Sequence, residues 1–194
     1  MSKKKLYASF DIEADGEVPV KNSMLSIGIV FFEPDGKEIK SYQRNLLPLS
    51  DRVQDPKCMS EFWSKHPESW KFVTSNQIDA KDFVKELEDI LTTLNKTYDI
   101  SFVAHPAAYD WQWLKSYYEL FKSESAPNLG FSARCASTLF WTYCKQNNII
   151  SKKDLEEFRK TLSAGFTLTH NPEDDAREQG TVFINLCKKM NISL

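Results

Sequence analysis

The chain has 194 residues, of which 41% are hydrophobic, 13% aromatic and 27% charged, and its formal net charge is −2. This composition excludes a disordered chain, which would be poorer in aromatic residues, and a count of 6 glycines and 8 prolines excludes a collagen-like chain. No apolar run approaches the roughly 18 residues of a membrane span, and the N-terminus lacks a signal-peptide core, so we expect one intracellular, cytoplasmic domain over residues 1–194 with no membrane partner.

The first elements in chain order are expected to be strands. Residues 5–13 alternate between apolar and polar side chains, and residues 25–32 form a nearly continuous apolar run. The turn sequence Glu33-Pro34-Asp35-Gly36 separates this run from a third strand expected at 39–46. Three strands joined through a tight turn predict an antiparallel meander.

Helical periodicity dominates the rest of the chain. Apolar residues recur at helical spacing in four segments, which are 78–94, 108–121, 153–162 and the segment that begins at Asn171-Pro172. We also expect a short helix from about Ser60 and a strand at 99–105, while residues 134–143 fit either a strand or a helix. Strands first, then strands alternating with helices, predict a mixed α/β sheet flanked by helices.

Asp11 and Glu13 are the first candidates for a functional site. They end the first strand two residues apart, so both carboxylates project from the same face. Open α/β sheets place ligands at strand ends, and two close carboxylates repel each other unless a cation lies between them. A solvated strand end is the alternative interpretation, because an Asp-x-Glu triplet is common.

Two expected helix starts carry the other candidates. Asp110 lies in the first turn after the strand at 99–105, where the helix dipole alone would favour an acidic residue. His170 precedes the expected N-cap Asn171, and Asp175 follows in the opening turn of the last helix. Taken singly, the two acids fit capping and the histidine fits an ordinary surface or core position.

Taken together, the four acids and the histidine indicate a metal-dependent catalytic site. Four carboxylates match the needs of two divalent ions about 3.5–4 Å apart, which clamp the attacking and leaving oxygens of a phosphoryl displacement. Hard ions such as Mg²⁺ prefer oxygen ligands of this type. A histidine beside them, with a pKa near neutrality, suits deprotonation of an attacking water.

With these residues the chain resembles the DEDDh branch of the DEDD 3′–5′ exonucleases, a family with a ribonuclease H-like fold. Three ordered motifs carry the resemblance, namely Asp11-Ile12-Glu13, the segment from His105 to Asp110, and His170 with Asp175-Ala176. Leu25-Ser26-Ile27-Gly28 resembles the glycine-containing second strand of this family. Phe62-Trp63 is similar to an aromatic pair in the Rv2179c-like exoribonuclease and phage exonuclease subgroup.

The resemblance implies roles at the matched positions. Two Mg²⁺ or Mn²⁺ ions would be held by four carboxylates, those of Asp11, Glu13, Asp110 and Asp175. His170 would be the general base, and the backbone near Ile12 and Ala14 would hold the terminal nucleotide. Departures from the family pattern at Ala14-Asp15, Pro106 and Pro172 affect inferred substrate contacts but leave the five chemical positions intact.

Three further residues are candidates for contact with the terminal base. Met24 and Leu25 could wedge against it, and Trp63 could stack on it, because every base has a π-face. Core packing is the alternative for all three.

We therefore expect a metal-dependent 3′–5′ exonuclease that releases nucleoside 5′-monophosphates from single-stranded RNA or DNA 3′ ends. The subgroup likeness favours RNA. A DNA exonuclease of the proofreading type is one alternative, and an inactive ribonuclease H-like module that binds nucleic acid or protein is another. Relatives often pair, so a homodimer stands as an alternative to a monomer.

Overall fold

One five-stranded sheet organises the chain in the computed structural model, which describes residues 3–194. The spatial order of the strands is β3-β2-β1-β4-β5. Their bounds are β1 Lys4–Ala14, β2 Met24–Phe32, β3 Glu38–Asn45, β4 Tyr98–Ala104 and β5 Arg134–Cys135. Strands β1, β2 and β3 pair antiparallel, whereas β4 pairs parallel with β1 and β5 parallel with β4. The predicted antiparallel meander and mixed sheet are thereby confirmed.

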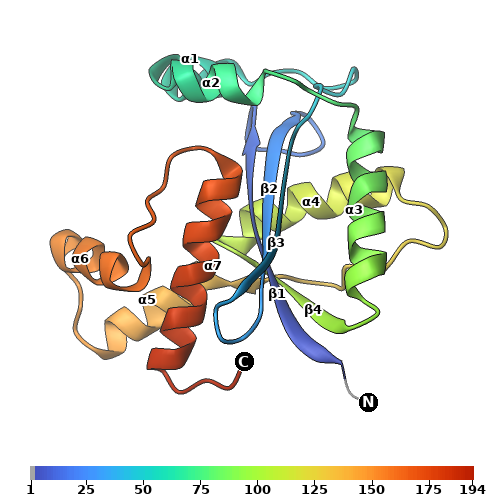
Figure 1. Cartoon of the computed structure of the whole chain (residues 1–194). Helices are drawn as coiled ribbons and strands as arrows, with labels where there is room; N and C mark the ends of the chain where they lie inside the picture. The colour runs from blue at the N-terminus through green and yellow to red at the C-terminus, as the bar shows by residue number, and fades with distance from the viewer. Residues whose placement is uncertain (1–2) are drawn as a thin grey trace.

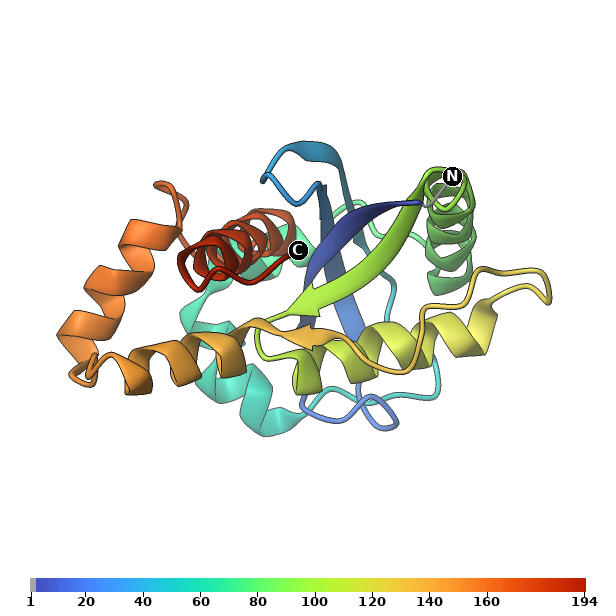
Figure 2. The same ribbon diagram turned by 90° about the horizontal axis from the view of Figure 1, so that it is seen from below.

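Helices cover both faces of the sheet (Figures 1 and 2). In chain order they are α1 Pro56–Glu61, the short 3₁₀ helix η1 Trp63–Lys65, α2 Pro67–Val73, α3 Ala80–Leu94, α4 Ala107–Phe121, α5 Ala136–Gln146, α6 Lys152–Leu162 and α7 Pro172–Lys189. Helices α3 and α4 lie on one side, and α7 lies on the other with α5 and α6 outside it. Helices α1 and α2 lie at the end of the sheet where β1 finishes.

The alternation of β1 explains the two cores. Phe10 and its apolar neighbours face α3 and α4, where they join the larger core with Phe83 and Trp113. Tyr7 faces the opposite way and packs with Phe183 of α7. Both faces of β1 are therefore buried, and only its end is free to carry a site.

Local capping chemistry sets the helix starts. Asp79 accepts a hydrogen bond from Lys81 N at the start of α3, and Asn171, the N-cap that the sequence predicts, accepts one from Glu173 N. The region expected to hold a helix from about Ser60 instead starts its helix at Pro56, because Asp55 caps the backbone nitrogen of Cys58. The ambiguous segment 134–143 divides into the two-residue strand β5 and the start of α5.

None of the helices within residues 3–194 is long and apolar enough to cross a membrane.

Candidate active site

The end of β1 carries two of the five predicted site residues. Asp11 pairs with Gly28 of β2, and the ladder shifts register after Glu13, so the strand bends at the site. The pairing of β1 with β4 extends only to Ser9, which leaves the other edge of β1 open beside Asp11 and Glu13. Asp11 keeps part of its surface exposed, and Glu13 is 8% exposed.

The first turn of α7 brings Asp175 and His170 to the same place. The Asp175 carboxylate accepts hydrogen bonds from the backbone nitrogens of Thr169 at 2.6 Å and His170 at 3.0 Å. These two bonds hold His170 at a φ of +58°, in the left-handed region that non-glycine residues seldom adopt. Asp175 therefore fixes the backbone from which the histidine side chain projects.

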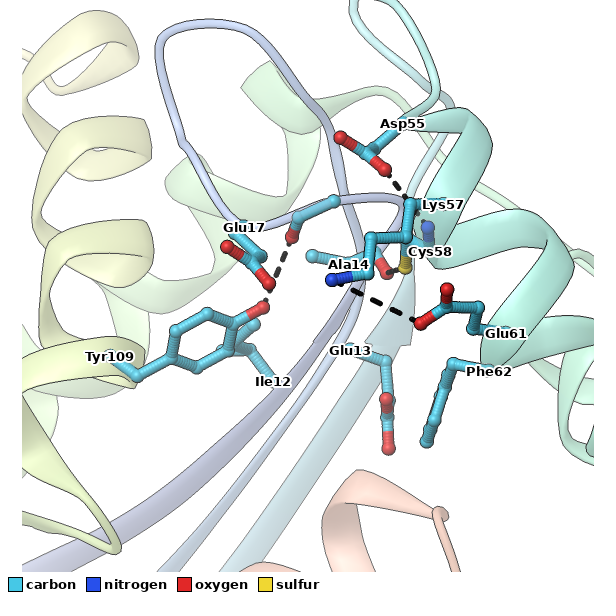
Figure 3. A pocket seen from close by; sticks show the side chains of 11 residues that line it. Ile12, Glu13, Ala14, Glu17, Asp55, Lys57, Cys58, Glu61, Phe62 and Tyr109 are labelled. Atoms are coloured by element: carbon cyan, nitrogen blue, oxygen red, sulfur yellow. Dashed lines mark hydrogen bonds and ion pairs between the residues drawn. The ribbon is translucent and has the colours of Figure 1, made fainter.

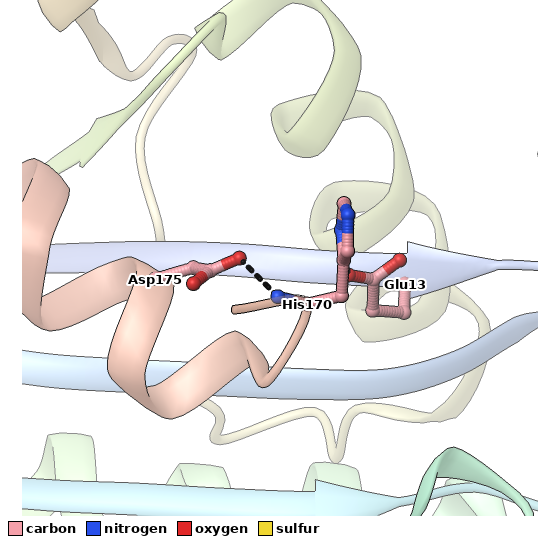
Figure 4. A group of neighbouring side chains, drawn as sticks. All are labelled: Glu13, His170 and Asp175. Atoms are coloured by element: carbon pink, nitrogen blue, oxygen red, sulfur yellow. Dashed lines mark hydrogen bonds and ion pairs between the residues drawn. The ribbon is translucent and has the colours of Figure 1, made fainter. Parts of the chain in front are cut away.

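Glu13, His170 and Asp175 form a compact group (Figure 4). Nδ1 of His170 lies 3.6 Å from Oε1 of Glu13. One potential ligand atom from each of the three residues lies within 4.8 Å of the other two. Strand β1 and helix α7 thus supply one carboxylate each, and the loop just before α7 supplies an imidazole to the same small volume.

Asp110 approaches the group from α4. It lies in the first turn of that helix and is 3% exposed. Its Oδ2 is buried and accepts no hydrogen bond from any residue within 3–194. A buried carboxylate oxygen without a donor is costly, so a bound cation is the natural partner for this atom.

The four carboxylates lie close enough to influence one another's ionisation. Burial and the charges of Asp110, Glu13 and Asp175 raise the pKa of Asp11 well above its usual value. Burial raises the pKa of Asp110 to about 7. Burial also raises the pKa values of Glu13 and Asp175, although His170 partly offsets the effect on Glu13.

This arrangement fits a divalent cation. Four oxygen-donating carboxylates lie close enough for their negative charges to repel one another, and one buried oxygen has no donor within residues 3–194. Mg²⁺ and Mn²⁺ prefer oxygen ligands of this kind. The structure brings together all five residues that the sequence singles out, with the three of Figure 4 in the tightest contact.

The three residues expected at the terminal base lie in the core instead. Met24 and Leu25 are fully buried, and Trp63 is 2% exposed. The indole nitrogen of Trp63 donates a 3.0 Å hydrogen bond to the carbonyl oxygen of Ala14. Met24 packs in the core between the sheet and α3 and α4, whereas Leu25 and Trp63 pack together with Val73 and residues of α1, so in this structure the three side chains support the strand ends.

A cavity of about 430 Å³ opens beside Glu13 (Figure 3). Phe62, the residue after α1, and Tyr109 of α4 line it, and the Tyr109 hydroxyl donates to the carbonyl oxygen of Gly16. Residues 12–14 at the end of β1 form another part of the lining. Of the adjacent pair Phe62 and Trp63, it is therefore Phe62 that reaches the cavity, whereas Trp63 is buried.

Sequence reasoning missed several residues that contact the site. The ring of His170 lies 5.1 Å from that of Phe62 and 4.6 Å from that of His66. Gln179 donates a hydrogen bond to Asp11. Gln179 follows Asp175 by one helical turn, a spacing visible in the sequence, but no local pattern signals the approach of His66.

Comparison with known proteins assigns this chain to a family of nucleases. The model of the 3′–5′ exoribonuclease Rv2179c-like domain matches residues 7–186. The chain is 25% identical over 181 residues to the 3′–5′ DNA exonuclease Cap18 of Escherichia coli, covering 93% of this chain and 90% of that protein. The resemblance drawn from the sequence motifs is therefore confirmed.

Solved structures share the fold. Escherichia coli exonuclease I, in complex with a dT13 oligonucleotide, superposes with a TM-score of 0.68 at 12% identity, over 95% of this chain and 41% of that one. Exonuclease I from Methylocaldum szegediense gives a TM-score of 0.70 at 10% identity, over 96% and 41% of the two chains. A full-length 3′-exonuclease gives 0.62 at 12% identity, over 97% and 84%. The chain thus spans about two fifths of the exonuclease I chains, and the ribonuclease H-like fold is confirmed.

Proposed function

The chain belongs to the family of Rv2179c-like 3′–5′ exoribonuclease domains, and we propose that its 3′–5′ exonuclease activity depends on divalent metal ions and acts on single-stranded nucleic acid, with RNA preferred. The product is a nucleoside 5′-monophosphate at each step. The observation that carries the proposal is the grouping of Glu13, His170 and Asp175, within reach of the charges of Asp11 and Asp110.

We assign the metal site to the four carboxylates, those of Asp11, Glu13, Asp110 and Asp175. When bound, two Mg²⁺ or Mn²⁺ ions would supply charge stabilisation for the attacking and leaving oxygens. The unpartnered Oδ2 of Asp110 and the mutual repulsion of the acids support this assignment. The metal-containing exonuclease I structure, a zinc form of the Escherichia coli enzyme, supports metal dependence in this fold.

His170 is the general base in this proposal. With Nδ1 beside Glu13, Nε2 is the ring nitrogen that can accept a proton from the attacking water. The water oxygen forms a bond to phosphorus, and the bond from phosphorus to the O3′ of the preceding nucleotide breaks. The leaving O3′ takes up a proton from solvent and His170 returns its proton to solvent, so the shortened strand ends in a 3′-hydroxyl.

The cavity beside Glu13 is the proposed site of the terminal nucleoside. Phe62 and Tyr109 offer flat rings on which a base can stack without sequence preference. Ile12 and Ala14 also line this cavity, and the family resemblance implies that the backbone near them holds the terminal nucleotide. We propose that residues 1–194 act as one exonuclease domain.

RNA preference rests on the family to which the chain belongs, and a DNA substrate is the second candidate. The relationship to the DNA exonuclease Cap18 favours that candidate. The test is a time course on 5′-labelled RNA and DNA strands of equal sequence, with Mg²⁺, with EDTA and with a blocked 3′ end. Faster shortening of RNA is expected, and degradation that ignores either EDTA or the 3′ block would contradict the mechanism.

Binding without hydrolysis is the outcome expected of an inactive module, and the same assay distinguishes it. Retained strand binding with no shortening in Mg²⁺ or Mn²⁺ would favour that alternative. The presence of all four carboxylates argues against it. Light scattering on the purified chain tests the homodimer that the family resemblance suggests.

A further inference from the structure

The buried amide of Gln179 contacts the proposed metal site from the middle of α7. Gln179 is 3% exposed, and its Nε2 donates a 2.7 Å hydrogen bond to Oδ1 of Asp11. The two residues are 168 positions apart in the chain. Within residues 3–194, no other side chain donates a hydrogen bond to Asp11.

The carbonyl oxygen of the same amide indicates that packing alone does not account for a glutamine at position 179. Oε1 of Gln179 is buried and has no hydrogen-bond partner in the described part of the chain. A buried carbonyl without a partner is destabilising, and a leucine or methionine of similar size would avoid the penalty. The feature that only the amide supplies is its NH₂ group facing Asp11.

The contact restricts the orientation of one carboxylate. Only the NH₂ end of the amide can face Asp11, because a carbonyl oxygen would repel the carboxylate. Holding Oδ1 limits rotation of the Asp11 side chain and leaves its second oxygen free of protein donors. Helix α7 also carries Asp175 one turn earlier, so one helix supplies a carboxylate and orients another.

We propose that Gln179 is the positioning residue for Asp11 and holds its carboxylate in the orientation that binds a divalent cation. The inference rests on the proposed function, since it assumes that Asp11 is a metal ligand. Groups that hydrogen-bond to metal ligands orient them, and their loss commonly lowers metal affinity about 10- to 100-fold.

The test measures Mn²⁺ binding to the full chain by isothermal titration calorimetry. The variants are Gln179→Leu and Gln179→Met, which keep the volume and remove the donor. The matched control is Asn185→Leu, because Asn185 donates its own amide hydrogen bond, 2.7 Å long, to the carbonyl oxygen of Leu162 at a distance from the site on the same helix. Unfolding temperatures in EDTA are recorded for all four proteins.

We expect both Gln179 variants to bind Mn²⁺ about 10- to 100-fold more weakly, with unfolding temperatures in EDTA at or above that of the wild type. At saturating Mn²⁺ their KM for the oligonucleotide stays at the wild-type value. The control loses stability and keeps its Mn²⁺ affinity. Unchanged affinity in both Gln179 variants overturns this inference alone, whereas a wild-type chain that binds no Mn²⁺ overturns the proposed function.

Discussion

Gly28 of β2 and Glu173 of α7 approach so closely that no side chain fits between them. A Cβ added to Gly28 would lie 2.2 Å from the backbone nitrogen of Glu173 and 2.2 Å from the carbonyl carbon of Pro172. Gly28 is also the residue paired with Asp11 across the sheet. The absence of a side chain at Gly28 therefore lets the first turn of α7 lie directly against the strand that borders Asp11.

Gly28→Ala is expected to displace the start of α7 and, with it, Asp175. The clash is with backbone atoms, which cannot rotate away, so we expect a stability loss of about 1–3 kcal/mol and weaker Mn²⁺ binding. Urea denaturation and calorimetry measure the two effects. Gly130→Ala is the control, because it adds a methyl group where nothing lies within 4 Å. Its strained φ lowers stability without changing metal affinity, and wild-type behaviour of Gly28→Ala would refute the prediction.

His170→Ala is expected to remove the proton acceptor while leaving the carboxylates in place. Loss of a general base lowers turnover about 10²- to 10⁴-fold, so kcat should fall by this amount. Mn²⁺ affinity, measured by calorimetry, should change little, since His170 is not among the proposed ligands. Near-normal turnover by this variant would show that another group accepts the proton.

Asp110→Asn is expected to stabilise the metal-free protein at high pH. Burial raises the pKa of Asp110 in the folded state to about 7, above the ordinary 3.8. Protonated Asp110 therefore contributes fully to the free energy of unfolding below about pH 4, and this contribution is lost as the pH rises through 7. The difference between the two pKa values corresponds to roughly 4 kcal/mol. The neutral variant avoids this loss, so its advantage is absent near pH 4 and largest at pH 8.

Urea unfolding in EDTA, followed by tryptophan fluorescence, measures this difference. Saturating Mn²⁺ should reverse the order, because the variant lacks a ligand and gains less from the ion. Asp89→Asn, at an exposed position on α3, is the control and should match the wild type at each pH. A variant less stable than the wild type in EDTA at pH 8 would refute the electrostatic interpretation.

Phe62 and His66 are expected to hold the ring of His170. Their rings lie 5.1 and 4.6 Å from it, and they come from the segment around η1 that lies over the end of β1. Small misplacements of reacting groups can lower rates about 100-fold, so we expect His66→Leu to lower kcat by about tenfold or more.

Phe62 also lines the cavity, so Phe62→Ala should raise KM as well as lower kcat. Steady-state kinetics on a labelled oligonucleotide separates the two effects. Glu68→Gln, at an exposed position on α2, is the control that should leave both constants unchanged. An unaltered kcat in both aromatic variants would show that His170 needs no support from this segment.

The positions of several site residues were predictable from the sequence because they depend on strand alternation and helix capping. The alternation of β1 places Asp11 and Glu13 on one face, and the Asn171-Pro172 start of α7 places Asp175 in its first turn. The sequence was less informative around α1, where the aromatic pair Phe62-Trp63 does not reveal which ring faces the cavity. The structure buries Trp63 against Ala14 and leaves Phe62 at the cavity wall.

The sequence by itself determined the strands, the helix starts and the identity of the charged groups, because these depend on neighbours within a few residues. Only the tertiary structure decided that Gln179 meets Asp11 across 168 positions, that Gly28 admits the first turn of α7, and that His66 lies against His170. These contacts depend on how the helices pack against the sheet. Packing brings together residues that are far apart in the chain, and no local sequence pattern indicates which of them will meet.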